Sequence, residues 1–508
     1  MIRGHAVEDV RAAERAVMEE VPEGALMQRA AAGLATAVLE ELRSARGRAY
    51  GGRVVLLVGA GSNGGDALWA GARLLRRGVR VEAVLVAGRA HEEGLAAFLG
   101  AGGRSYSTPV SSRGSPAPIG SSRGDPATLI TEALRGADVV VDGLLGIGGR
   151  PGLGDDVAAL VDRLPDGVPV VAVDLPSGVD PDTGECPGPV LRATRTVTFG
   201  TAKPCLLLPP SDRAAGRVDV VDIGLGPALD RALAGRAPAV ERLESVDLAA
   251  AWPVPGAGDD KYRRGVVGVV AGGHLYTGAA VLACGAAVRS GAGMVRYVGP
   301  QEPTDRVRAR WPEVVPGEGR VQAWVLGPGV DPDAGDGQPD AVRGALASGL
   351  PCVVDAGALA LLPDRVEGPV LLTPHAGELA RLLAARGGGA VERPDVESAP
   401  LRHARRAAEL TGATVLLKGA TTLVVTPDGR VRSQADAPHW MATAGSGDVL
   451  AGLAGALLAA GLEPLDAGSV AAAVHGRAGR RASGGGPIAA DDVIAALRAT
   501  VVDLLTSS

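Results

Sequence analysis

Cysteine is scarce and scattered in this chain. The four cysteines, Cys186, Cys205, Cys284 and Cys352, lie far apart and form no paired spacing. This scarcity argues against a disulfide framework and against a zinc site. It fits a reducing compartment, and we predict a cytoplasmic protein.

Long apolar runs and excess positive charge are also missing. The longest apolar stretches, such as 449–461, are interrupted by glycine and are shorter than the ~20 residues of a membrane span. The opening segment 1–21 is too charged for a signal peptide. A net charge of -6 argues against general affinity for phosphate backbones or anionic membranes. We therefore expect neither nucleic acid nor a membrane as partner.

Lysine and asparagine are almost absent, which is typical of a base-composition bias. Only Lys203, Lys261 and Lys418 are lysines among 51 basic residues, and Asn63 is the one asparagine. A lysine ammonium is compact and an arginine guanidinium is a broad fork, so a site shaped for one does not accept the other. These exceptions are candidate functional residues, although Lys203 and Lys261 are explained equally well by a structural role.

The length and the apolar pattern predict two α/β domains. The 508 residues exceed the ~250 that one hydrophobic core usually serves. Continuous β-branched runs alternate with helical segments, which predicts parallel sheets covered on both faces. The first half is expected to be a Rossmann-like doubly wound sheet. Its strands are predicted at 53–58, 79–87, 138–142, 168–174 and 195–199, with helices at 66–77 and 155–164.

The alternation stops around 227–250 and then restarts. We therefore assign 1–226 to a first domain, 227–249 to a linker and 250–508 to a second α/β domain. The stretch 104–127, rich in Ser, Gly and Pro, is predicted to be a surface loop. Strands of the second domain are expected at 266–271, 294–298, 321–326, 351–355, 369–373, 413–417 and 421–426, and helices at 277–290, 398–411, 448–461 and 489–503.

A glycine-rich turn follows the first strand of the first half. Gly59, Gly61 and Gly64 match G-x-G-x-x-G, the dinucleotide pattern. Alone this match is weak, and the acid that binds ribose in dehydrogenases is missing from the end of the second strand. The turn instead carries Asn63 and Asp66, and for Asp66 a simple helix cap is an equally good explanation.

Two further strand ends are polar. Asp142 opens DGLLGIGGRPGLG, and Asp174 opens DLPSGVD, which contains Ser177. Strand ends of a doubly wound sheet share one crevice, so Asn63 and these three residues are expected to converge. Their oxygen atoms suit a hard cation.

GAGSNGGD, DGLLGIGGRPG and DLPSGVD resemble the epimerase domain of the NAD(P)H-hydrate repair enzymes. The resemblance implies that the hydrated nicotinamide dinucleotide is lined by two segments, that Asp174 contacts it near the reacting carbon, and that K⁺ is bound by Asn63, Asp142 and Ser177. The segments are Ser62, Asn63, Gly64, Gly65, Asp66, and Gly146, Ile147, Gly148, Gly149, Arg150, Pro151, Gly152. Three departures from the family are Ser62 for Asn, Ala67 for Gly, and LMQRAA at 26–31 for LMENAG.

The segment 439–461 carries the most specific motif. Gly445, Ser446 and Gly447 open a long apolar helix, so their backbone N–H groups can point at an anion. Asp448 follows directly, where a carboxylate suits a general base acting on a hydroxyl near a nucleotide's terminal phosphate. The alternative, an ordinary acid at a helix N-terminus, needs fewer small residues than are present.

GSGD resembles the anion-binding motif of ribokinase-like kinases. With KYRRG, AGGHLYTGAA, SGAGMV, TPHAGE and LKGATT, it resembles the ADP-dependent NAD(P)H-hydrate dehydratases over nearly all of 250–508. The resemblance implies a ribokinase-like fold. The implied nucleotide-binding residues are Lys418, Gly419, Ala420, Thr421, Thr422, Gly445, Ser446 and Gly447. The implied hydrate contacts are Ala279, Gly329, His375 and Asp448. One departure is Gly357, where the family commonly has a second Asp.

These observations predict a bifunctional repair enzyme. The first half epimerises R- and S-NAD(P)H hydrate, with Asp174 as a catalytic residue. The second dehydrates the S form to NADH or NADPH, with Asp448 as catalytic base, ADP as co-substrate and Mg²⁺ on the phosphates. We also expect a homo-oligomer. The alternatives are a small-alcohol kinase of the ribokinase superfamily and a first half that only binds a ligand. His375 also fits a loop-stabilising role.

Overall fold

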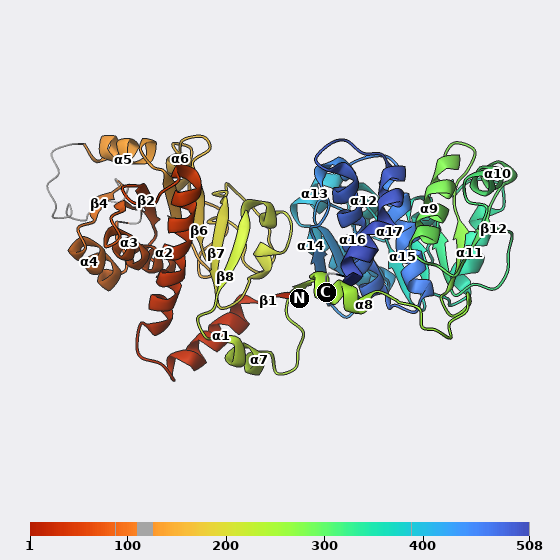
Figure 1. The fold of residues 1–508 in the computed structure, drawn as a ribbon, viewed down its shortest axis with the longest axis horizontal. Coiled ribbons are helices and arrows are strands. Elements are labelled where there is room, and N and C mark those ends of the chain that lie inside the picture. Colours follow the sequence, from red (N-terminus) through yellow and green to blue (C-terminus); the bar gives the residue numbers. More distant parts are fainter. Residues whose placement is uncertain (87, 109–124, 388, 507–508) are drawn as a thin grey trace. The chain divides into compact units, whose positions relative to one another are not determined.

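The computed structural model describes residues 1–86, 88–108, 125–387 and 389–506 (Figure 1). Its residues form two compact units. One unit is Arg3–Ala239, and the other is Val240–Ser508 together with Met1 and Ile2. No helix in these ranges is both long and apolar enough to cross a membrane.

The first unit is built on a parallel sheet. Its described strands have the order β4-β3-β2-β5-β6-β7-β8, and every neighbouring pair is parallel. The strands are β2 (Arg53–Val58), β3 (Arg80–Leu85), β4 (Arg104–Ser107), β5 (Val139–Gly143), β6 (Val170–Val173), β7 (Arg195–Phe199) and β8 (Arg217–Val221).

Helices cover both faces of this sheet. Val54 and Leu56 of β2 pack with α1, α2, α3 and α7, whereas Val55 and Leu57 pack with α5 and α6. This alternation follows from the two-residue period of a strand. The helices are α1 (Val7–Met18), α2 (Ala25–Arg46), α3 (Ser62–Leu75), α4 (Glu92–Gly100), α5 (Pro126–Arg135), α6 (Asp155–Val161) and α7 (Gly226–Leu233), with 3₁₀ turns η1 (Pro204–Leu206) and η2 (Ser211–Ala214).

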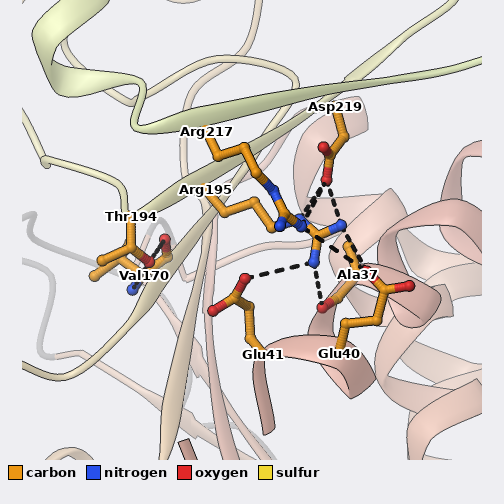
Figure 2. A network of polar contacts seen from close by, with 8 residues as sticks. All are labelled: Ala37, Glu40, Glu41, Val170, Thr194, Arg195, Arg217 and Asp219. Carbon is orange, nitrogen blue, oxygen red and sulfur yellow. Dashed lines mark hydrogen bonds and ion pairs between the residues drawn. The ribbon is translucent and has the colours of Figure 1, made fainter. Parts of the chain in front are cut away.

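A buried arginine fixes α2 against this sheet. The Arg195 guanidinium of β7 donates to Ala37 O at 3.1 Å, to Glu41 Oε1 at 3.4 Å and to Glu40 Oε2 at 2.8 Å, and it also contacts Asp219 of β8 (Figure 2). The planar fork of arginine suits several acceptors at once. The network holds the long helix that begins with LMQRAA in place over β7.

The second unit contains a larger mixed sheet. Its order over the described residues is β1-β9-β18-β17-β16-β15-β14-β13-β10-β11-β12; β16, β17 and β18 pair antiparallel, and β10 to β16 pair parallel. The strands are β1 (Ile2–Gly4), β9 (Val240–Arg242), β10 (Val266–Val270), β11 (Met294–Val298), β12 (Val315–Pro316), β13 (Ala323–Leu326), β14 (Cys352–Val354), β15 (Val370–Leu372), β16 (Thr414–Leu417), β17 (Thr422–Val425) and β18 (Val431–Gln434).

One apolar cluster joins this sheet to α8, α9, α15, α16 and α17. Helix α14 packs against β16 and β17. The helices are α8 (Ser245–Ala251), α9 (Thr277–Arg289), α10 (Gln301–Arg310), α11 (Gln338–Ala347), α12 (Ala376–Ala385), α13 (Arg393–Ser398), α14 (Pro400–Thr411), α15 (Ser446–Ala459), α16 (Pro464–Ser483) and α17 (Ala490–Thr506), with η3 (Ala356–Leu361) and η4 (His439–Met441).

Two expectations about irregular segments need correction. The predicted loop 104–127 begins with strand β4, which pairs with β3, and it ends in α5, which starts at Pro126 behind an Asp125 cap; residues 109–124 lie outside the described ranges. Strands do not stop over 227–250, because β9 pairs with β18. Three strand residues in β9 and four in β4 give too short a pattern to recognise in the sequence.

Close packing of α15 on α9 gives a first prediction. An ideal Cβ on Gly452 would lie 2.1 Å from Ala283 O of α9, so Gly452→Ala must separate the two helices. We expect a loss of about 1–3 kcal/mol in the free energy of unfolding. Gly344→Ala in α11, where nothing lies within 4 Å, should instead raise stability by about 0.5–1 kcal/mol.

Thermal unfolding followed by tryptophan fluorescence checks this pair of variants. Trp252, Trp311, Trp324 and Trp440 belong to the second unit, so the signal reports mainly that unit. Equal melting temperatures for the two variants would contradict the packing argument.

Candidate active sites

The N-terminus of α15 forms the centre of the site in the second unit. Gly445 is its N-cap, with φ +84°, a left-handed conformation that favours glycine. An ideal Cβ on Gly447 would lie 3.3 Å from Lys418 Nζ. The Lys418 ammonium thus lies beside the N-terminus of the helix, where the helix dipole also favours negative charge, which is an arrangement suited to an anion.

A buried ion pair stands beside this helix start. Lys418, which follows β16, donates from Nζ to Asp355 Oδ1 at 2.7 Å, and its Nζ lies 3.7 Å from Glu378 Oε2. Burial by itself lowers the pKa of Lys418, but the Asp355 and Glu378 carboxylates outweigh that effect and raise it. The lysine is therefore charged at neutral pH.

Asp448 is placed among the same charges. Burial first, and then the Asp355 carboxylate, raises the pKa of Asp448 to about 7, although the Lys418 ammonium opposes the shift. A carboxyl with such a pKa accepts and releases a proton near neutral pH, which is what a general base requires.

Two cavities border this cluster. One, of about 560 Å³, is lined by His375, Lys418, Gly419, Ala420, Thr422, Ser446, Gly447 and His475 among others. The other, of about 700 Å³, is lined by Tyr276, Gly329, Gly357 and Glu378 among others. His375 and Glu378 form the capping box of α12, so one hydrogen-bonded pair borders both cavities.

In the first unit, three polar side chains meet where the strand order reverses between β2 and β5. Ser177 donates from Oγ to Asp142 Oδ1 at 2.6 Å and from its backbone N–H to Asp142 Oδ2 at 2.8 Å. Asn63 Nδ2 donates to Val173 O at 2.5 Å and to Leu145 O at 3.2 Å. The switch point of the sheet thus brings together oxygens of five residues, namely the side chains of Asn63, Asp142 and Ser177 and the backbone carbonyls of Leu145 and Val173.

Within the described part of the chain, the Asp142 carboxyl of this cluster has only uncharged hydrogen-bond donors. Burial raises the pKa of Asp142 to about 6, and the hydrogen bonds from Ser177 and Leu144 oppose the shift. The donors to this carboxylate are therefore neutral hydroxyl and amide groups.

A second buried ion pair lies close by. Asp174 has φ +68°, uncommon for a residue with a side chain, and its Oδ1 accepts from Lys203 Nζ at 2.5 Å and from Thr198 Oγ1 at 3.0 Å. Lys203 also donates to Phe199 O at 2.9 Å. Lys203 is almost completely buried, so its charge is compensated mainly by Asp174.

A cavity of about 840 Å³ opens beside these groups. Its lining includes Glu14 of α1, Met27 and Gln28 of α2, and Ser62 and Asp66 of α3. Segment 146–152 does not line this cavity; it lies next to Asn63, since an ideal Cβ on Gly146 would be 2.3 Å from Asn63 Oδ1.

Comparison with known proteins identifies the family. The model for NAD(P)H-hydrate dehydratase matches residues 267–494, and the model for the YjeF-related protein N-terminus matches residues 23–205. The bifunctional NAD(P)H-hydrate repair enzyme Nnr of Mycobacterium tuberculosis (strain H37Rv) is 44% identical over 474 residues, which cover 90% of this chain and 89% of that protein. The chain belongs to the bifunctional NAD(P)H-hydrate repair enzymes.

Other similar proteins include the repair enzyme Nnr of Mycobacterium leprae, which is 42% identical over 93% of both chains. A solved ADP/ATP-dependent NAD(P)H-hydrate dehydratase from Bacillus subtilis, co-crystallised with ATP and Mg²⁺, is 25% identical with a TM-score of 0.48 and covers 52% of this chain and 99% of that one. The two family models and the Mycobacterium relatives confirm the family that the motifs indicated. Its members are enzymes with an epimerase and a dehydratase domain.

The departures from the repair-enzyme pattern at Ala67 and Gly357 have local explanations. Ala67 is buried against Gly143, whose ideal Cβ would lie 2.8 Å from Ala67 Cβ, so the missing side chain on Gly143 makes room for it. An ideal Cβ on Gly357 would lie 1.9 Å from Val330 O; an aspartate there requires a different backbone path. Gln28 Oε1 accepts from Arg73 at 2.8 Å and lines the cavity of the epimerase half.

The structure brings together most of the predicted site residues and adds others. Ala279 lies next to Gly329, because an ideal Cβ on Gly329 would be 2.8 Å from Ala279 Cβ. Thr421 is buried but does not line the cavity of about 560 Å³.

Sequence reasoning missed Asp355, Glu378 and Glu14. Asp355 could have been recognised from the sequence, because it directly follows the apolar strand β14, just as Asp174 directly follows β6.

The position of Asp448 predicts the pH dependence of the dehydratase half. A general base must be ionised, so kcat/KM should rise about tenfold per pH unit below about pH 7 and level off above it. Dehydration of the S hydrate, followed by absorbance of the reduced nicotinamide, measures this profile. The residual kcat/KM of Asp448→Asn should not show this rise below about pH 7. A wild-type profile that is flat between about pH 6 and 8 would contradict the assignment.

Proposed function

We propose that the first half interconverts R- and S-NAD(P)H hydrate and that the second half dehydrates the S form at the expense of ADP, giving AMP and phosphate. The observation that carries the dehydratase proposal is Asp448, which follows the N-terminal turn of α15 and lies close to Lys418. A base next to an anion-binding turn suits phosphoryl transfer to a hydroxyl.

Each residue of this site has a role in the proposed reaction. Hydroxide is a poor leaving group, whereas phosphate leaves readily. Asp448 takes the proton of the substrate hydroxyl, and the hydroxyl oxygen attacks the terminal phosphorus of ADP. The bond from that phosphorus to the bridging oxygen breaks, and AMP leaves with the electron pair. The amides of Ser446 and Gly447 and the Lys418 ammonium stabilise the charge that develops on the phosphoryl oxygens. The ring then loses phosphate and a proton from the neighbouring carbon, and the C=C bond that forms restores the dihydronicotinamide.

The two cavities of this half suit the two substrates. The 560 Å³ cavity contains Lys418, Gly419, Ala420, Thr422, Ser446 and Gly447, and we assign it to ADP. The 700 Å³ cavity contains Gly329, next to Ala279, and we assign it to the hydrate. Asp355 and Glu378 provide carboxylate oxygens of the kind that Mg²⁺ prefers; Mg²⁺ supplies charge neutralisation on the phosphates when it is bound.

The epimerase half fits a monovalent cation. Asn63, Asp142, Ser177, Leu145 and Val173 bring their oxygens close together at the switch point. Among the described residues, the donors to the Asp142 carboxylate are neutral. Hard oxygen ligands and an uncompensated carboxylate match K⁺. We propose that K⁺ binds there and that Asp174 lies near the reacting carbon of the hydrate.

Two predictions from the sequence remain predictions. These are the homo-oligomeric state and the cytoplasmic location. The same holds for the domain limits 1–226 and 250–508.

An assay with purified protein, ADP and NADH hydrate tests the whole proposal. We expect recovery of reduced nicotinamide from both epimers. Asp448→Asn should lower the dehydratase rate by ~10²–10⁴-fold, as loss of a general base does, and Asp491→Asn, an exposed acid at the start of α17, should not. Recovery of one epimer only would leave the first half as a binding module, and no recovery with active phosphorylation of another alcohol would favour a kinase.

Stability distinguishes loss of chemistry from loss of fold. Because the pKa of Asp448 is raised from 3.8 to about 7 in the folded state, the unfolded chain releases this proton first. This group therefore lowers stability as the pH rises from about 4 to about 7, with no further loss above that. Asp448→Asn should therefore unfold at an equal or higher temperature than the wild type at pH 8. The difference should vanish as the pH falls toward 4.

Cation binding is tested without any activity measurement. K⁺ bound only by the folded state should raise the melting temperature of the first unit, compared with choline at equal ionic strength. Asp142→Asn should remove the K⁺-specific part of that rise, because it removes the charge that compensates the cation. An equal effect of both salts on the wild type would exclude the site.

A further inference from the structure

One buried carboxyl of the epimerase cavity takes part in none of the contacts described so far. Asp66, on the first turn of α3, is 6% exposed and lines the 840 Å³ cavity. Among the described residues its Oδ1 has no hydrogen-bond partner. Leaving such an atom unpaired costs about 1–3 kcal/mol, so its retention calls for a function.

The surroundings of Asp66 decide its protonation. Three carboxyl groups, those of Glu14, Asp66 and Asp174, lie within the electrostatic influence of the Lys203 ammonium; Arg11 and Arg15 act in addition on Glu14. Lys203 is hydrogen bonded to Asp174, so Asp174 takes the negative charge that balances it. Burial, followed by repulsion from Asp174 and Glu14, raises the pKa of Asp66 well above its ordinary value. Other titratable groups lining the cavity are His91, Glu92 and Glu93.

We propose that Asp66 is the proton donor of the epimerase half, an inference that rests on the epimerase activity proposed above. The assignment comes from geometry: a nearly buried carboxyl, with one oxygen unpaired, lines the cavity next to an ion pair that already uses the available positive charge. Asp174 then serves as the fixed anion of the site and Asp66 as its acid.

The chemistry balances without a further reactant. A hydrated dihydronicotinamide carries its hydroxyl on a carbon next to the ring nitrogen. The Asp66 carboxyl protonates this hydroxyl, the C–O bond breaks, and its electron pair leaves with water. The nitrogen lone pair forms a C=N bond, and the Asp174 carboxylate offsets the positive charge. Water then adds to the opposite face of that carbon, and the surplus proton returns to the Asp66 carboxylate through solvent.

The test measures interconversion of the purified epimers by the full chain without ADP, so that the dehydratase half is idle. Asp66→Asn keeps the shape of the side chain and cannot donate a carboxyl proton. We expect kcat for epimerisation to fall by ~10²–10⁴-fold with little change in KM. Glu14→Gln, which removes another carboxyl lining the same cavity, should have a smaller effect.

Binding and pH profiles complete the test. A tetrahydronicotinamide dinucleotide that lacks the hydroxyl should bind Asp66→Asn about as well as the wild type, which also shows that the variant is folded. The wild-type rate should fall at high pH, where an acid loses its proton, and the residual rate of Asp66→Asn should not.

The outcomes separate this inference from the function on which it rests. Failure of the wild type to accelerate interconversion overturns both. Acceleration that Asp66→Asn retains, or that Glu14→Gln abolishes more completely, overturns the role of Asp66 alone.

Discussion

In each half of the chain one buried lysine ammonium is held against the carboxylate of an aspartate that follows a parallel strand. Lys203 binds Asp174, and Lys418 binds Asp355. Burying these charges is possible only because each ammonium and its carboxylate compensate one another. Burial raises the pKa of a further carboxyl near each pair, that of Asp66 in the first half and that of Asp448 in the second. Burial is the main cause of both shifts, and the aspartate of each ion pair adds to it.

The glycines around the second site allow the backbone of α15 to come close to neighbouring groups. Gly445 permits the left-handed turn before α15, Gly447 leaves the helix start open toward Lys418, and Gly452 lets α15 contact α9. A side chain at any of these positions either fills the anion-binding turn or moves the helix that carries Asp448. Packing and chemistry are therefore coupled along one helix, which is why the stability of this segment bears on catalysis.

The two halves act on the same hydrate in different reactions. Epimerisation makes both hydrate epimers available to a dehydratase that uses one of them, so the pair recovers more cofactor than either half alone. The two sites differ in the charge they manage. The first needs an acid and a fixed anion near a carbon next to nitrogen, and the second needs a base and positive groups around phosphate.

The sequence alone determined much of the strand pattern and several of the candidate site residues. Long β-branched runs predicted most central strands, because a strand buried on both faces must be apolar throughout. The scarcity of lysine and asparagine pointed to Asn63, Lys203 and Lys418, and the tertiary structure buries two of these lysines in sites while Lys261 stays exposed beside Tyr262. Short strands such as β4 and β9, and the Gly- and Ala-rich helix α16, gave too little periodic signal. The partners of each charge were decided only by the fold. Asp355 and Lys418 are 63 residues apart in the chain, and they meet only because the sheet places the ends of β14 and β16 on either side of β15. Burial, which shifts the proton equilibria of Asp66 and Asp448, is likewise a property of the packed chain.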